Sequence, residues 1–363
     1  MSTLPSLPLS SAEFYAPYHG HNAEHLAALL PALRGPSQRR IIWLAGDSSL
    51  DNKYWLSGAP IPAANGLQAL LRPPASPPDI AAHLNALCAA SAPGLACLNA
   101  AVEESTLAQR AGARALALPQ DALVAASLAP GDVLVASAGG NDVVLRPSLA
   151  TVAALGAVLL LGSDAAIDAG TACGMGALVA LFKGRMEAWL RALTARCAPA
   201  LVVPCFPYFP CEAGSGWADG ALAALGYNAR PERLQRVMRA VYARATALLE
   251  VPGARVAPLP LFEVLDAARE GDYVARVEPS GAGGEKMARA ILARVLEAEG
   301  GGAARGGGAG GRLSRRPAGS AKNVFLPSSF YFFNGDFRPS SRSREVFQQG
   351  KRGAALCSTA PRP

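Results

Sequence analysis

Two short polar motifs follow hydrophobic runs that predict β-strands, and both contain residue types suited to acyl transfer. Residues 40–45 lead into Gly46-Asp47-Ser48, and residues 132–138 lead into Gly139-Gly140-Asn141. A serine hydroxyl can attack a carbonyl carbon, and a side-chain amide beside it can donate a hydrogen bond to the oxyanion that forms. The pair therefore predicts Ser48 as a nucleophile and Asn141 as an oxyanion donor, with Gly140 letting the backbone approach a ligand. Either motif alone is also typical of an ordinary turn.

Alternating strand and helix patterns surround these motifs. Five strand-like runs cover residues 40–45, 95–99, 132–138, 201–204 and 255–258, and the clearest helical periodicities cover residues 178–193, 231–249 and 287–296. Strands separated by helices pair in parallel through right-handed crossovers, so we expect an α/β fold, a three-layer α/β/α arrangement around a parallel five-stranded sheet. Ligands of such sheets bind at the carboxyl ends of the strands, where both motifs are predicted to lie.

The two motifs resemble the first and third sequence blocks of the SGNH (GDSL-like) hydrolase superfamily. The resemblance covers roughly residues 39–296. It implies a flavodoxin-like fold and the hydrolysis of esters, thioesters or acetyl groups by the serine. It also implies that the Ser48 N–H and a backbone N–H after the second strand complete the oxyanion hole. Glu104 lies nearest to the family's glycine at that second position, and its carboxylate would oppose an oxyanion unless it points away.

The family's last block, Asp-x-x-His, is altered in this chain. The equivalent stretch places Ala275 at the aspartate position and Glu278 at the histidine position. The histidines, which are His19, His21, His25 and His83, all precede the second predicted strand. We interpret the first three as part of a solvated N-terminal segment and His83 as a surface or half-buried residue, so none is expected to replace the missing base.

Glu278 has two interpretations. A glutamate assists the serine of sedolisin-type peptidases at acid pH, but with an ordinary pKa of about 4.3 it is a weak base at neutral pH unless burial raises the pKa. Alternatively, Glu278 is an anion at the start of the last helix, whose dipole would lower its pKa. Asp272 is either an assistant to Glu278 or a turn cap. The sequence thus leaves open an active serine hydrolase and a catalytically inactive SGNH-fold binding protein.

Charge and composition define the remaining parts of the chain. The net charge of +7 arises from the C-terminal end, because from Gly301 onward there are 11 Lys or Arg against 2 Asp or Glu. We predict an N-terminal lead-in at residues 1–38, an SGNH-hydrolase-like domain at 39–299 and a disordered Gly/Arg/Ser-rich tail at 300–363. Nucleic acid is expected only in weak, salt-sensitive contacts of the tail. Residues 51–55 are either pocket lining or an exposed loop with one buried tryptophan.

No cofactor or metal is expected, because the cysteines are scattered without a C-x-x-C pair and phosphate-binding glycine fingerprints are absent. The most apolar stretch, residues 149–161, is shorter than the roughly 20 residues that span a bilayer, and the N-terminus lacks a signal-peptide pattern. We therefore expect a cytoplasmic protein, without membrane insertion, that acts on a small-molecule ligand of the ester or acetyl type. The sequence does not indicate an oligomeric state.

Overall fold

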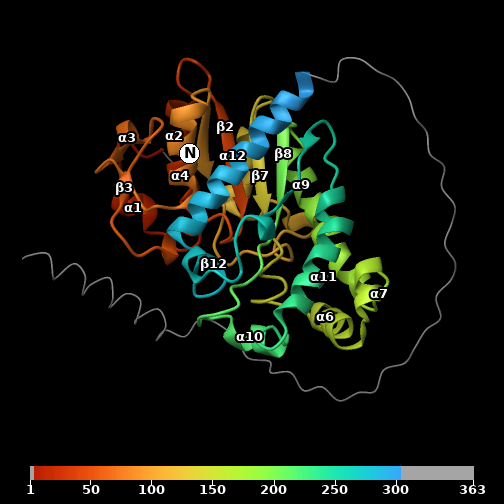
Figure 1. Cartoon of the computed structure of the whole chain (residues 1–363). Coiled ribbons are helices and arrows are strands. Elements are labelled where there is room, and N and C mark those ends of the chain that lie inside the picture. Colours follow the sequence, from red (N-terminus) through yellow and green to blue (C-terminus); the bar gives the residue numbers. More distant parts are fainter. Residues whose placement is uncertain (1–3, 304–363) are drawn as a thin grey trace, which may run out of the picture. The chain divides into compact units, whose positions relative to one another are not determined.

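A central parallel sheet organises the chain in the computed structural model, which describes residues 4–303 (Figure 1). Its strands lie in the order β10-β8-β7-β2-β6, and β9 also pairs with β8. Their bounds are β2 (Arg40–Gly46), β6 (Leu95–Asn99), β7 (Val133–Ser137), β8 (Leu201–Phe206), β9 (Arg255–Val256) and β10 (Leu259–Pro260). The five predicted strands thus pair in the sequence order 2-1-3-4-5, which confirms the flavodoxin-like fold class. The fifth is split into β9 and β10, because Pro258 between them has no N–H to donate.

Two layers of helices cover the sheet, as predicted. Alternate residues of β2 point to opposite faces: Ile41, Trp43 and Ala45 belong to one hydrophobic cluster, Ile42 and Leu44 to the other. The first cluster includes residues of α2 (Ala23–Arg34), α5 (Pro119–Ser127), α6 (Leu149–Leu161), α9 (Met186–Thr194) and α11 (Pro231–Arg244). The second includes residues of α4 (Ile80–Ser91) and α12 (Gly281–Ala303), and Figure 1 shows α12, in blue, crossing that face. Burial on both faces explains why the strands are continuous hydrophobic runs.

The N-terminal residues contribute to this core. Leu26, Leu29 and Leu33 on one side of α2 are fully buried in the first cluster, and Gly35, with a φ of 58°, ends the helix. The shorter elements are α1 (Ser11–Tyr15), α3 (Leu67–Leu70), α7 (Asp164–Ala169), α8 (Met175–Val179), α10 (Asp219–Ala224) and the two-stranded pairs β1 (Leu9–Ser10) with β4 (Leu71–Arg72), β3 (Ile61–Pro62) with β5 (Ala75–Ser76), and β11 (Tyr273–Val274) with β12 (Glu278–Pro279). None of the helices between residues 4 and 303 is long and apolar enough to cross a membrane. The predicted disordered tail lies outside the described residues, apart from the end of α12.

Two predicted helices differ from regular α-helices. The segment predicted from its 3.6-residue period contains a π-helical turn, η3 (Ala180–Arg185), between α8 and α9. Turns of this kind occur frequently at functional sites, and Phe182 of this turn contacts the cavity described below. The helix that starts at Pro231 ends at Arg244 rather than near residue 249, because the chain enters a 3-10 turn, η4 (Thr246–Leu248).

Candidate active site

The nucleophile turn begins where β2 lies closest to β7. Gly46 pairs with Ser137 in the sheet register, and the N–H of Asp47 donates to the Ser137 carbonyl at 3.0 Å. Gly46 has a φ of 134°, and a Cβ built on it would lie 1.7 Å from the Ser137 oxygen. Only glycine fits that approach, which brings Ser48 out at the carboxyl edge of the sheet.

The loops after β6 and β7 are joined at the same edge. The Asn141 amide donates from Nδ2 to the Ser105 carbonyl at 3.1 Å. The next carboxylate, that of Asp142, accepts the N–H groups of Leu107 and Ala108 at 2.7 and 2.9 Å. Ser48, Gly140 and Asn141 all line one cavity. The structure thus brings these three predicted site residues together, while their catalytic roles remain predictions.

Glu104 has a backbone conformation that favours glycine. Its φ is 59°, in the left-handed region that favours glycine. Its carboxylate accepts a hydrogen bond from the Tyr18 hydroxyl at 3.1 Å and forms an ion pair with Arg146 at 3.1 Å. The backbone conformation is therefore retained at this position, and the side chain has partners that partly offset its charge.

Glu278 lies on β12 and lines the same cavity as Ser48. It is 1% exposed, and the indole Nε1 of Trp217 donates to its Oε1 at 3.2 Å. The Ser48 hydroxyl is close enough to the same carboxyl group to lower its pKa, but no hydrogen bond joins the two side chains in the described part of the chain. Oε2 of Glu278 has no hydrogen-bond partner among residues 4–303.

Burial raises the pKa of Glu278 from 4.5 to about 8. The nearby Ser48 hydroxyl and the Trp217 indole oppose the rise in pKa, and the charges of Asp47 and Glu104 add to it. The expectation that the helix dipole would lower this pKa is wrong, because α12 begins only at Gly281 and desolvation is the largest effect. The same cause raises the pKa of Asp47 to about 6.

Asp272 has partners of its own near β12. Its two carboxylate oxygens accept hydrogen bonds from Lys286 Nζ at 2.8 and 2.6 Å, and one also accepts the N–H of Asp266 at 3.2 Å. No hydrogen bond to Glu278 is present within the described part of the chain. These contacts support a structural role for Asp272. No hydrogen bond among the described residues supports the predicted assistance to Glu278.

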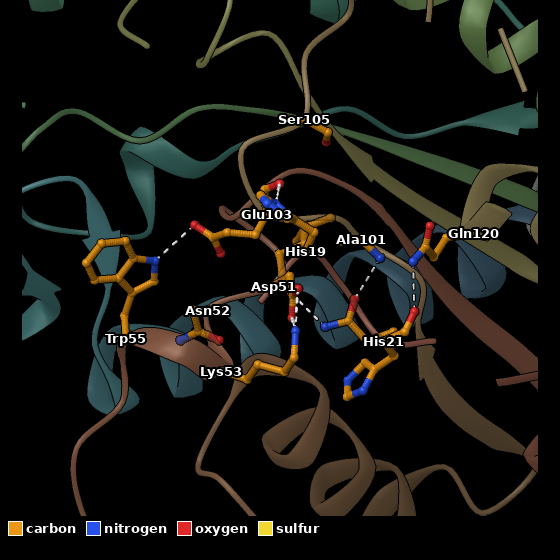
Figure 2. A network of polar contacts seen from close by, with 12 residues as sticks. His19, His21, Asp51, Asn52, Lys53, Trp55, Ala101, Glu103, Ser105 and Gln120 are labelled. Carbon is orange, nitrogen blue, oxygen red and sulfur yellow. Dashed lines mark hydrogen bonds and ion pairs between the residues drawn. The ribbon is translucent and has the colours of Figure 1, made fainter. Parts of the chain in front are cut away.

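The segment after the nucleophile is a buried polar network rather than an exposed loop. Asp51 and Lys53 form an ion pair at 2.6 Å whose side chains are 0% and 1% exposed, and Figure 2 shows them pointing toward each other. Asn52 donates to the Pro279 carbonyl at 3.0 Å and accepts the N–H of Ile80 at 3.2 Å. Asn52 therefore holds β12, which carries Glu278, against the nucleophile turn. The sequence signal for this role was the polar run directly after Ser48.

A second buried glutamate neighbours Glu278. Glu103 is 3% exposed, and its Oε1 accepts a hydrogen bond from Trp55 Nε1 at 3.0 Å (Figure 2). Burial raises its pKa well above the ordinary value, and the charges of Glu278 and Asp51 raise it further. Sequence reasoning missed Glu103, because nothing in its local pattern distinguishes it from a surface residue.

The expectation of a solvated N-terminal segment fails at His21, which is buried, whereas His19 is exposed and His25 is half-buried. His21 is 2% exposed, stacks on Phe14 with ring centroids 4.0 Å apart, and contacts the Phe14 carbonyl through Nδ1 at 2.8 Å. Desolvation lowers its pKa. His19 Nδ1 lies 3.3 Å from the Glu103 carbonyl. Among residues 4–303, no three His, Cys, Asp or Glu side chains are grouped so that they could hold a metal ion.

A largely apolar cavity extends from Ser48. It encloses about 130 Å³. One end is polar, with Ser48, Asn141 and Glu278, whereas the remainder is lined mainly by apolar side chains. These come from α6, α8, η3, α10 and α11 and include Leu155, Leu178, Phe182, Leu222, Leu234 and Val237.

The strand order confirms the flavodoxin-like α/β fold, and the two motifs meet at one cavity, as the resemblance to SGNH hydrolases implies. No protein-family model and no curated protein matches the sequence. Similar solved structures include the lipase Lip_vut3 from a goat rumen metagenome, with 14% identity over 70% of this chain and 97% of that chain, at a TM-score of 0.40. An extracellular lipase from Streptomyces rimosus has 17% identity over 71% and 99%, at 0.36. The acetylxylan esterase Axe2 from Geobacillus stearothermophilus has 16% identity over 70% and 94%, at 0.37. Because these identities and TM-scores are low, the function has to be argued from the residues of the site.

Proposed function

We propose that this protein is a serine ester hydrolase in which Glu278 serves as the base for Ser48. The observation that carries the proposal is that Ser48 and the buried carboxyl group of Glu278 line the same cavity, where burial raises the pKa of that carboxyl group to about 8. A general base is most effective when its pKa lies near the working pH. Burial thus makes the Glu278 carboxylate more basic, so that it can take the role that a histidine has in SGNH hydrolases.

The reaction follows an acyl-enzyme route. The Glu278 carboxylate accepts the hydroxyl proton while Ser48 Oγ attacks the ester carbonyl carbon. Asn141 Nδ2 and the backbone N–H groups of Ser48 and Glu104 stabilise the oxyanion. Glu278 then gives its proton to the leaving alcohol, and the acyl group stays on Ser48. Water, deprotonated by Glu278, attacks the acyl-serine, which releases the acid and restores the hydroxyl.

Labelling with a fluorophosphonate probe at pH 7 and pH 8.5 tests the proposal. We expect stronger labelling at pH 8.5, with the adduct mapped to Ser48 by peptide mass spectrometry and lost in Ser48→Ala. Ser91→Ala, which removes an exposed hydroxyl on α4, is the matched control and should label normally. Absence of labelling at both pH values in folded protein would refute the hydrolase and favour the alternative, a catalytically inactive SGNH-fold binding protein.

The acyl group of the substrate is a separate question. The sequence predicts a small ester or acetyl group, and the reaction at Ser48 is the same for any acyl ester. The size and lining of the cavity next to Ser48 indicate which acyl group fits.

A further inference from the structure

The apolar wall of the cavity begins at the predicted oxyanion motif. Gly139 has a φ of 112°, and a Cβ built on it would lie 2.7 Å from Cε1 of Phe182. Phe182 therefore packs directly on the residue before Gly140. Val143 and Val144, which follow Asn141 in sequence, also line the cavity. A substrate carbonyl held by Asn141 would thus have apolar side chains immediately beside it.

The two sides of a bound ester have different requirements. The acyl group stays on the enzyme through both half-reactions, so it gains from an apolar pocket throughout. The leaving group must depart, and water must then enter at the base. The proposed base, Glu278, lies among other acidic side chains: the charge of Glu104 raises its pKa, and its own charge raises the pKa of Glu103. The apolar cavity is therefore suited to the acyl side.

We propose that this cavity binds a medium-chain acyl group, such as octanoyl, of the ester substrate. This inference rests on the proposed function and replaces the acetyl group expected from the sequence. An acetyl methyl group would contact only the polar end and leave most of the apolar lining without a partner. A longer chain covers Leu155, Leu178 and Phe182, which line the remainder.

Hydrolysis of ethyl acetate, ethyl butanoate, ethyl octanoate and octyl acetate below their solubility limits provides the test. Each methylene buried in the transition state should raise kcat/KM about fourfold, so ethyl octanoate should exceed ethyl acetate by about a hundredfold if between three and four of its six additional methylenes are buried, and by about 4,000-fold if all six are. A preference for ethyl acetate would overturn the inference while leaving the serine hydrolase intact. A preference for octyl acetate over ethyl octanoate would show that the cavity takes the alcohol, which also overturns it.

A pair of variants on α6 locates the effect. Leu155 is 4% exposed and lines the cavity, whereas Leu160 on the same helix is 70% exposed. In Leu155→Trp the added ring fills the cavity, so the octanoate-to-acetate ratio of kcat/KM should fall at least about tenfold. Leu160→Trp should keep the wild-type ratio. Equal ratios in the two variants would overturn the assignment.

Binding to Ser48→Ala separates the pocket from the chemistry. Trp217 lines the cavity, so its fluorescence should change when methyl octanoate binds and not with methyl acetate. If methyl octanoate binds, if Leu155→Trp abolishes that binding, and if the wild-type protein hydrolyses no ester, the acyl-binding cavity is supported and the proposed function is refuted. Turnover without any preference for octanoyl esters would refute the pocket alone.

Discussion

The raised pKa of Glu278 makes a prediction about activity at each pH. With a pKa of about 8, roughly one-tenth of Glu278 is ionised at pH 7 and nine-tenths at pH 9. Because only the ionised form accepts the Ser48 proton, kcat/KM should rise about tenfold over that range and then level off. In Glu278→Gln the side chain keeps its shape but has no carboxylate to accept the Ser48 proton, so kcat/KM should fall by a factor of about 10² to 10⁴.

The same pKa also predicts how stability depends on pH. Glu278 ionises near 4.5 when unfolded and near 8 when folded, so between these values the folded state binds more protons. Its contribution to stability is complete below about pH 4.5 and is lost as the pH rises through about 8, by up to about 1.4 kcal/mol per pH unit. Glu278→Gln never ionises, so its Tm relative to wild type should increase between pH 5 and pH 8.5.

Thermal unfolding and pH-stat assays of both proteins test these statements together. The charges facing Glu278 are those of Asp47, Glu103 and Glu104. All three groups are present in both proteins, and because removing the charge of Glu278 also lowers the pKa of Glu103, the difference between the proteins reports on Glu278 together with Glu103. Glu297→Gln on α12, whose side chain is 69% exposed, is the control and should change neither profile. A pH-independent kcat/KM between pH 6.5 and 9, or a Tm difference that does not vary with pH, would refute the reasoning.

Three further substitutions test the elements around this pair. Asn141→Ala removes the side-chain oxyanion donor and should lower kcat by about 10² to 10³, measured at saturating substrate; an unchanged kcat would exclude that role. Gly46→Ala places a Cβ 1.7 Å from the Ser137 oxygen and should cost about 4 kcal/mol or more in denaturant unfolding, and wild-type stability would contradict the stated strand contact. Asp272→Asn breaks the pair with Lys286 and should destabilise by about 1–3 kcal/mol without moving the pH profile of kcat/KM. A moved profile would show that Asp272 acts on Glu278.

The sequence predicted the fold well because the relevant signals are local. Strand runs, helical periods and the turn after Gly46 depend on backbone conformation and on which side chains a sheet buries, and these repeat over a few residues. The parallel pairing of β2 with β7, and hence the approach of Ser48 to Asn141, followed from alternating strands and helices. The 3.6-residue period over residues 178–193 did not predict the π-helical turn at Ala180–Arg185.

The chemistry of the site depended on contacts between distant segments. The sequence by itself determined which residues are present at the sheet edge: a serine, an amide and a glutamate in place of histidine. Only the tertiary structure decided the basicity of that glutamate, because its pKa is set by desolvation. The surrounding atoms come from β12, Trp217 and the nucleophile turn. The burial of Asp51 and Lys53, and the size of the apolar cavity, were likewise decided by packing between segments far apart in the chain.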